Sequence, residues 1–208
     1  TTEATFDIQY GYIKRFSARN TSWDMARYEV PAHRYADLSD SQYGVAILND
    51  CKYGHKVLER TLDLTLLRSP KYPDFNADMG HHEFTYSLLP HIGSMVESNV
   101  INNAAILNQP PLRFAGLKAV SLEMPCVLDS DDISMEVVKK AEKEDCLVVR
   151  LVETKGRRSK GVLSFNRPIE KVVATNMIEW EDNGLMELDG QAVEVSLKPF
   201  EIATYKVY

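Results

Sequence analysis

Apolar and polar residues alternate with a period of two along much of the first half of the chain. The alternation is clear in residues 4–13, 62–66 and 83–90. It places every second side chain on one face, which predicts β-strands that are buried on one side. Residues 43–48 are continuously apolar and predict a short strand buried on both faces. Prolines and turn-forming residues in 69–82 predict a long irregular loop.

One helix is predicted near the end of this half. Ser94 and Glu97 have the spacing of a capping box, in which two side chains bond each other's backbone amides at a helix N-terminus. The consecutive prolines Pro110 and Pro111 end the helical pattern. Apolar residues between these signals lie three or four positions apart and would share one helical face: Val96, Val100, Ala104 and Leu107.

After the prolines the pattern consists of short strands separated by turn residues such as Asn183-Gly184 and Asp189-Gly190. About seven short strands with a turn every 8–12 residues are typical of a β-sandwich. We therefore expect a mainly β protein with a β-rich domain containing one short helix (residues 1–110) and a small all-β sandwich (111–208). The predicted strands of the second domain are 119–123, 133–138, 146–152, 160–165, 172–175, 192–197 and 202–207.

The composition narrows the function classes. A formal net charge of −6 gives the chain no electrostatic reason to bind nucleic acid or an anionic membrane. No apolar run reaches the roughly 18 residues that a transmembrane helix needs. The three cysteines form no close pair, so neither a disulfide framework nor a zinc finger is predicted. A reducing compartment fits best, and we expect a cytoplasmic protein.

The sequence contains few groups with the spacing of a known catalytic or metal site. His81 and His82 are adjacent in a loop near Asp78 and Glu83, but neighbouring histidines on a strand point to opposite faces and rarely bind one metal together. No nucleophile elbow, glycine-rich phosphate loop or catalytic cysteine context is present. Aspartate and glutamate are abundant, so spacing alone selects no carboxylate pair for glycoside hydrolysis.

Two polar stretches are denser in functional groups. The first, residues 19–33, offers the parts of a sugar site: an aromatic face for the ring and polar groups for its hydroxyls. The alternative is an irregular polar loop that its tryptophan anchors to the core. The candidates in this stretch are Arg19, Asn20, Trp23, Asp24 and His33.

The second stretch directly follows the apolar run 43–48 and contains Asn49, Asp50, Lys52 and Tyr53. It is either ordinary turn chemistry after a strand or a loop that presents polar groups to a cleft. Asp50 could bind a sugar hydroxyl directly, or hold Arg19 or Lys52 through a charge-assisted hydrogen bond.

Together with their surroundings, the two stretches resemble the α-mannosidases of glycoside hydrolase family 38, particularly the cytosolic and bacterial members. Before Arg19 the family pattern leads us to expect a Pro-Thr-His-like segment, where this chain has Phe16-Ser17-Ala18. The matching segments span nearly the whole chain in the family's order: Phe6-Asp7-Ile8-Gln9-Tyr10-Gly11, Arg19-Asn20-Thr21-Ser22-Trp23-Asp24, Glu29-Val30-Pro31-Ala32-His33, Gly44-Val45-Ala46-Ile47-Leu48-Asn49-Asp50-Cys51-Lys52-Tyr53-Gly54, Leu66-Leu67-Arg68-Ser69-Pro70, His82-Glu83-Phe84-Thr85-Tyr86 and Leu197-Lys198-Pro199-Phe200-Glu201-Ile202-Ala203-Thr204.

The resemblance implies that residues 1–110 are the C-terminal part of the large family-38 β domain, a portion of a galactose-mutarotase-like supersandwich, and that 111–208 are the small terminal sandwich. It also implies retaining hydrolysis of terminal α-mannosidic linkages, assisted by zinc or another divalent cation. In that reading, the nucleophile, the acid and the metal ligands belong to an N-terminal catalytic domain of the same polypeptide, and none lies here.

This chain would then buttress and complete the active-site cleft, where α-mannoside oligosaccharides bind, and would be inactive alone. Apolar surface left exposed could also drive self-association into a homo-oligomer. Two alternatives stay open. The chain could be a carbohydrate-binding β-sandwich that acts by itself, or a purely structural scaffold.

Overall fold

The computed structural model describes residues 2–116 and 123–208. The chain divides into two compact units, Thr1–Phe114 and Ala115–Tyr208, and each is described by itself. The strand predicted at 119–123 lies outside the described residues, apart from Glu123, which is not in a strand. None of the described helices is long and apolar enough to cross a membrane.

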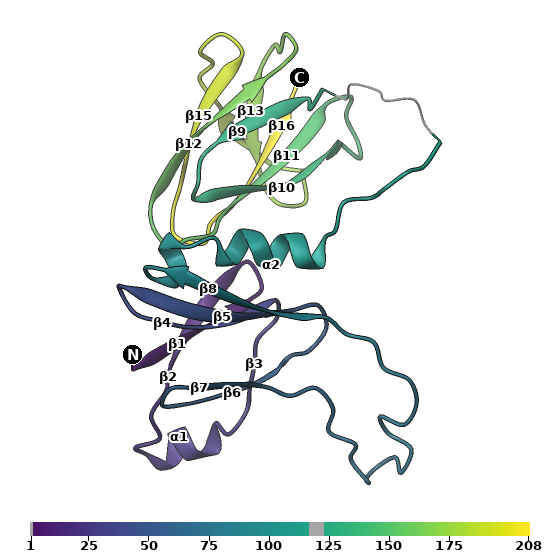
Figure 1. Cartoon of the computed structure of the whole chain (residues 1–208). Helices are drawn as coiled ribbons and strands as arrows, with labels where there is room; N and C mark the ends of the chain where they lie inside the picture. The colour runs from purple at the N-terminus through teal and green to yellow at the C-terminus, as the bar shows by residue number, and fades with distance from the viewer. Residues whose placement is uncertain (1, 117–122) are drawn as a thin grey trace. The chain divides into compact units, whose positions relative to one another are not determined.

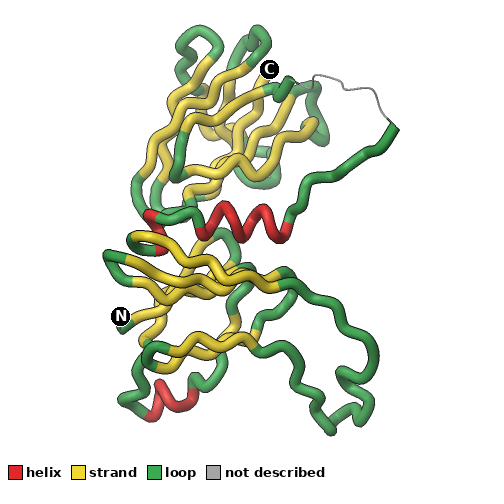
Figure 2. The backbone as a smooth tube through the Cα atoms, viewed as in Figure 1, coloured by secondary structure: helices red, strands yellow, loops and turns green. Residues whose placement is uncertain are grey.

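The first unit is built on a five-stranded antiparallel sheet with the strand order β2-β1-β4-β5-β8, and a second sheet of three strands has the order β3-β6-β7 (Figures 1 and 2). The strands of the larger sheet are β1 (Glu3–Ile8), β2 (Gly11–Phe16), β4 (Tyr35–Ser39), β5 (Tyr43–Asn49) and β8 (Tyr86–Ile92). Those of the smaller sheet are β3 (Val30–Pro31), β6 (Gly54–Leu58) and β7 (Thr61–Leu64).

Other elements pack on both faces of the larger sheet, since successive side chains of a strand point to opposite sides and both sides carry apolar residues. Helix α2 (Val100–Asn108) packs on one face, where its Val100 and Ala104 meet Tyr35, Ala46 and Leu48. The smaller sheet and its connections cover β1 and β4 on the opposite face, through a cluster of Ala4, Phe6, Ala32 and Ala36 with Val30, Leu38, Val57 and Leu62.

The expectation of a single strand over residues 4–13 is wrong. The chain turns at Gln9 and Tyr10, and Ile8 then pairs with Gly11 in the hairpin of β1 and β2. Tyr10, the second residue of this turn, adopts the left-handed conformation, with φ 51°. A two-residue turn preserves the period of two, so the alternation could not reveal it.

The apolar run 43–48 forms β5, but it is not buried on both faces. Gly44, Ala46 and Leu48 are buried, whereas Val45 and Ile47 are only half-buried. The loop predicted at 69–82 extends over residues 65–85.

The capping box of Ser94 and Glu97 is present, but it closes a single 3₁₀ turn, Met95–Glu97. Ser98 is extended and interrupts the helix, because its hydroxyl accepts a hydrogen bond from the Val100 amide and donates one to the Met95 carbonyl. Helix α2 begins only at Val100. The apolar face was predicted correctly and the helix start was not.

The second unit consists of two antiparallel sheets, with strand orders β10-β11-β16-β13-β14 and β15-β12-β9. Side chains of both sheets share one core, which includes Val149, Leu151, Leu163, Val195 and Tyr205. The mainly β fold with a sandwich and short helices is thus confirmed. The strands are β9 (Cys126–Asp129), β10 (Ile133–Lys140), β11 (Leu147–Glu153), β12 (Ser159–Phe165), β13 (Val172–Thr175), β14 (Asp182–Leu185), β15 (Ala192–Leu197) and β16 (Ile202–Val207).

Two of these strands were not predicted from the sequence, β9 and β14. Asn183-Gly184 was interpreted as a turn, but both residues lie in β14, which pairs with β13 at the end of its sheet. All four residues of β14 are exposed, so the strand has no apolar alternation to reveal it.

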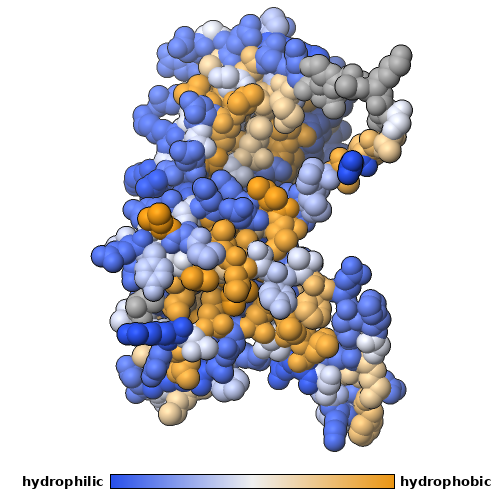
Figure 3. Space-filling model, in the orientation of Figure 1, coloured by the Kyte–Doolittle hydropathy of each residue, from blue (hydrophilic) through white to orange (hydrophobic). Residues whose placement is uncertain are grey.

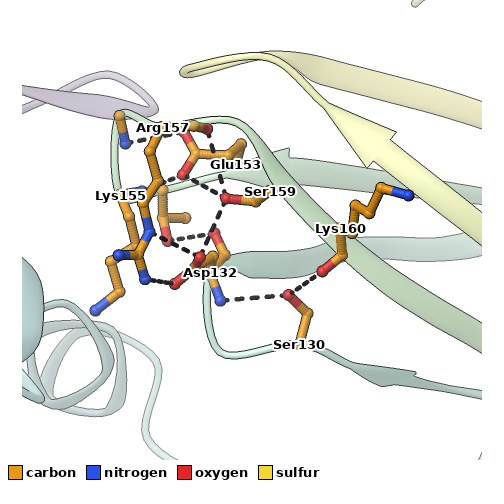
Figure 4. Close-up of polar contacts among 9 residues, drawn as sticks. Ser130, Asp132, Glu153, Lys155, Arg157, Ser159 and Lys160 are labelled. Atoms are coloured by element: carbon orange, nitrogen blue, oxygen red, sulfur yellow. Dashed lines mark hydrogen bonds and ion pairs between the residues drawn. The ribbon is translucent and has the colours of Figure 1, made fainter.

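A buried carboxylate joins the loops at one end of this sandwich (Figure 4). Glu153 is 0% exposed and accepts hydrogen bonds from the backbone amides of Lys155 (2.7 Å), Gly156 (2.9 Å) and Phe200 (2.8 Å). Beside it, Asp132 forms a two-point ion pair with Arg157 at 2.8 and 2.6 Å. The β11–β12 turn is therefore tied to the turn that precedes β16.

Candidate functional site

The first polar stretch is not irregular throughout, since residues Ser22–Ala26 form a short helix, α1. Thr21 and Asp24 close its N-terminus as a capping box, and the Asp24 carboxylate also binds Arg27 at 2.8 Å. The Thr21 hydroxyl, with backbone amides and Arg27, holds the pKa of Asp24 below its ordinary value. Asp24 thus serves the local fold, and its oxygens are already engaged. Of the five candidates in this stretch, Arg19, Asn20, Trp23 and Asp24 belong to this region, called here the α1 cluster.

Two cations of the α1 cluster share one aromatic ring. The Arg19 guanidinium lies 4.9 Å from the centroid of Tyr28 and donates to the Tyr28 carbonyl at 3.2 Å. The Lys56 ammonium lies 5.2 Å from the same ring and 2.9 Å from Asp63. Tyr28 and Lys56 were missed by the sequence reasoning. Lys56 had no signal, because it reaches the cluster only through the pairing of β3 with β6.

Trp23 is 79% exposed, so the expectation that it anchors the loop to the core is wrong. Met25 and Tyr28 beside it are also exposed, and α1 buries no residue. The hollow beneath α1 has about 20 Å³, which is room for a water molecule and not for a sugar ring. A sugar could therefore meet this cluster only on its open surface or in a cleft that other residues complete.

The remaining candidates form a β5-end cluster: His33, Asn49, Asp50, Lys52 and Tyr53. Asn49 is 1% exposed, and its side chain makes hydrogen bonds that stabilise the local fold. Its amide donates to the His33 carbonyl at 3.0 Å and accepts from the Lys52 amide at 2.6 Å. It orients the loop that carries the other candidates and has no surface to offer a ligand.

Asp50 directly follows β5, at the end of a buried strand. Both of its carboxylate oxygens accept from the Thr85 amide at 3.0 Å, which ties the end of loop 65–85 to β5. The Cys51 thiol and the Thr85 amide hold the pKa of Asp50 below its ordinary value. Asp50 therefore holds Thr85, and not Arg19 or Lys52 as considered from the sequence. The Lys52 ammonium lies instead 4.6 Å from the ring centroid of Phe84.

An aromatic pair forms the accessible part of this cluster. The His33 ring lies 5.5 Å from that of Tyr53, tilted by 47°, and Tyr53 is 57% exposed. With the ammonium of Lys52 and the carboxylate of Asp50 half-exposed nearby along the chain, the surface combines a ring face with both charge signs. Thr85 and Phe84 complete it, and neither was singled out as a candidate.

The contacts of the candidate residues thus fall into two groups, the α1 cluster and the β5-end cluster. The α1 cluster and the β5-end cluster are linked by the backbone pairing of Val30 with His55 and of Pro31 with Gly54. His82, which was considered as a metal ligand, bonds the Asp78 carbonyl at 2.9 Å. Among residues 2–116 and 123–208, no group of three or more His, Cys, Asp and Glu side chains is arranged to hold a metal ion.

Comparison with known families matches both units. Residues 1–76 match the glycosyl hydrolases family 38 C-terminal domain, and residues 132–205 match the family 38 C-terminal beta sandwich domain. The chain is 40% identical to mouse alpha-mannosidase 2C1, 37% to alpha-mannosidase G of Dictyostelium discoideum and 33% to alpha-mannosidase of Saccharomyces cerevisiae. These alignments cover 96%, 98% and 99% of this chain, but only 20%, 19% and 21% of the relatives.

The fold is also that of a solved relative. An alpha-mannosidase from Enterococcus faecalis V583 superposes with a TM-score of 0.77 and 22% identity, over 99% of this chain and 24% of that protein. The chain spans about a fifth of the length of the curated relatives it matches. Two matched domains of one family and similarity along the whole length lead to one conclusion: the chain belongs to the C-terminal region of glycosyl hydrolase family 38.

Proposed function

We propose that this chain is the C-terminal β region of a retaining α-mannosidase that hydrolyses terminal α-mannosidic linkages, and that it supports and completes the active-site cleft. The observation that carries the proposal is the similarity to alpha-mannosidases over 96–99% of the chain. The nucleophile and the acid would lie in an N-terminal catalytic domain, which is the partner of this chain. α-Mannoside oligosaccharides would bind in the cleft between them.

The zinc or other divalent cation expected for such an enzyme would also be held outside this chain. The described residues do not fit a metal site, because no three of their histidines, cysteines and carboxylates are arranged to hold one ion. The three cysteines are free thiols, one exposed and two buried, which supports a reducing location such as the cytoplasm.

The candidate residues would then act on the cleft side of this region. The α1 cluster presents Arg19 and Trp23, and the β5-end cluster presents His33, Asp50, Lys52 and Tyr53. A ring face beside charged groups is the chemistry that binds sugars. Asn20 adds an exposed amide, whereas Asp24 and Asn49 would hold the two loops in shape.

The test is hydrolysis of 4-nitrophenyl α-mannoside by an α-mannosidase polypeptide that contains this chain. Asp50→Asn is expected to lower kcat/KM while leaving the melting temperature unchanged, because the Asn oxygen can still accept from the Thr85 amide whereas the negative charge offered to the substrate is lost. Glu201→Gln in the second unit is the matched control, since Glu201 is also half-exposed and its carboxylate accepts from one backbone amide, that of Lys198, at 2.7 Å. Unchanged kinetics in Asp50→Asn would remove Asp50 from the site.

The 208-residue chain alone is expected to show no turnover, with or without added zinc. Turnover that survives repurification would overturn the proposal. A stand-alone carbohydrate-binding function is the second candidate, and the exposed pair of Tyr53 and His33 favours it. Titration of the chain with mannose and mannobiose, followed by tyrosine fluorescence, distinguishes it: saturation that Tyr53→Ala abolishes supports binding, and no saturation leaves a structural role.

A further inference from the structure

One face of the larger sheet in the first unit is apolar where no element of the described chain covers it. Strands β5 and β8 are neighbours, and their outward positions pair directly: Tyr43 with Ile92, Val45 with Pro90, and Ile47 with Leu88. We call these six residues the β5–β8 face. Leu88 is 65% exposed and Ile92 88% exposed.

Most of the alternate side chains of the same strands are covered, although Ser87 is exposed. Ala46, Leu48 and Leu89 pack in the cluster under α2. On the β5–β8 side, the three-stranded sheet covers β1 and β4 but stops at β7, whose Leu62 still packs in that core. An open hollow remains beside β7, lined by Leu38, Tyr43, Val45, Ile47, Leu62 and Leu88 together with the polar residues Ser39, Asp40 and Arg60.

The space-filling view shows apolar residues gathered over the part of the first unit where β5 and β8 run (Figure 3). A sheet face that meets water normally carries polar side chains at alternate positions. Every position of the β5–β8 face is instead apolar or aromatic. Contiguous exposed apolar surface of this kind marks an interface.

The edges of the sheets indicate what kind of element fits there. Among the described residues, β7 is the end strand of its sheet, so one side of its backbone has no strand partner. β8 is also an end strand, but Pro90 has no N–H and removes a donor from its ladder. A further strand would therefore pair better with β7, and from there its inward side chains would lie across β5 and β8.

We propose that the β5–β8 face is covered by a β-strand from the remainder of an α-mannosidase polypeptide, added to the three-stranded sheet beside β7. This inference rests on the proposed function, because that function supplies the occupant. The relatives are about five times as long as this chain, so most of their residues lie outside it. The added strand would carry apolar residues at alternate positions and complete the sandwich that the smaller sheet leaves unfinished.

The test is hydrogen exchange, measured on the 208-residue chain and on the α-mannosidase polypeptide that contains it. Amides in 43–47 and 86–92, and those of β7, are expected to exchange at least tenfold more slowly in the longer polypeptide. Leu88→Asp should abolish most of this difference, while circular dichroism and melting of the 208-residue chain stay unchanged. Leu185→Asp is the matched control, since Leu185 is 72% exposed on β14, and it should leave exchange at these amides unaltered.

Equal exchange in the two polypeptides would overturn the inference. So would a dimer of the 208-residue chain that Leu88→Asp dissociates, if the longer polypeptide shows no added protection, because a second copy would then be the occupant. Activity toward 4-nitrophenyl α-mannoside is measured on the same sample. An active enzyme with an unprotected β5–β8 face refutes this inference alone, whereas a protected face without activity refutes only the proposed function.

Discussion

The Nε2 atom of His91 on β8 lies 2.8 Å from the Oδ2 atom of Asp37 on β4, although β5 runs between these two strands. Asp37 is 0% exposed, and burial raises the pKa of its carboxyl above the ordinary value. The two side chains meet because the residue between them is Gly44. A Cβ there would lie 2.2 Å from the Cβ of Ser39 and 2.7 Å from the Cε1 of His91.

Gly44→Ala is therefore expected to destabilise the first unit. Neither neighbour can withdraw easily, because Ser39 and His91 both bond Asp37. Overpacking of this kind costs about 1–3 kcal/mol, measurable by urea denaturation. Gly54→Ala is the comparison, since its nearest neighbour, the Cβ of Thr65, would be 3.2 Å away. Equal losses in the two variants would contradict this explanation.

Glu153→Gln should destabilise the second unit. The amide side chain keeps one acceptor oxygen but places an NH₂ group against backbone donors that need an acceptor. Loss of hydrogen bonds to a buried charged group is expected to lower the free energy of unfolding by about 1.5–3 kcal/mol. Glu194→Gln is the control, because Glu194 pairs with Lys160 at 2.6 Å on an exposed surface. That change should stay within about 1 kcal/mol, and a similar loss in both would show that burial does not matter.

The first unit should lose stability in mild acid because of His55. His55 is 0% exposed, and its Nε2 has no hydrogen-bond partner among the described residues. Burial lowers its pKa below the ordinary 6.5. Between that lowered pKa and pH 6.5 the unfolded chain binds a proton that the folded chain does not, so stability falls as the pH falls through this window.

The measurement is urea denaturation between pH 7.5 and pH 5. His55→Phe should flatten the acid dependence, since it removes the titrating group and keeps a ring against Phe6. His81→Phe, at an exposed loop position, should retain the dependence. A His55→Phe chain with the original slope would assign the acid loss to other groups.

Trp23→Ala should leave the melting temperature of the 208-residue chain unchanged, because an exposed side chain loses little on truncation. Phe6→Ala is the contrasting variant: Phe6 is 1% exposed, and removing a buried aromatic ring costs about 3–5 kcal/mol. In an α-mannosidase containing the chain, Trp23→Ala should lower activity or stability if α1 faces the cleft or the catalytic domain. A chain that melts early through Trp23→Ala alone would restore the anchor interpretation.

Strands could be predicted from the sequence where one face is buried and the other is exposed to solvent. Six strands of the second unit were predicted as short apolar segments between turn residues; burial alternates in β12 and β15, whereas most residues of β11 and β16 are buried whichever face they point to. Strand prediction failed where a strand has no buried face, as in β14, and where a turn preserved the period of two, as at Tyr10. The start of α2 was missed because the Ser98 hydroxyl competes with the helix, and spacing does not show such a bond.

For the candidate site, the sequence located the two polar stretches. It did not show which of their residues support the local fold and which are accessible to a ligand. Asp24 and Asn49 looked like ligand-binding groups, yet both are occupied by backbone amides a few residues away. Short polar side chains serve loops and ligands with the same atoms, so residue type cannot separate the two uses. Lys56 joined the α1 cluster through strand pairing, which a single sequence does not reveal.

The hydrogen bonds around Glu153 also limit which substitutions this region can accept during evolution. Its partners at positions 155, 156 and 200 are backbone amides, which every amino acid except proline supplies. The side chains at these three positions can therefore change while the hydrogen bonds persist. New residues at positions 156 and 200 must still adopt the left-handed conformations of Gly156 and Phe200. Position 153 has no such freedom, since aspartate is one methylene shorter. Homologues should vary around an unchanging glutamate.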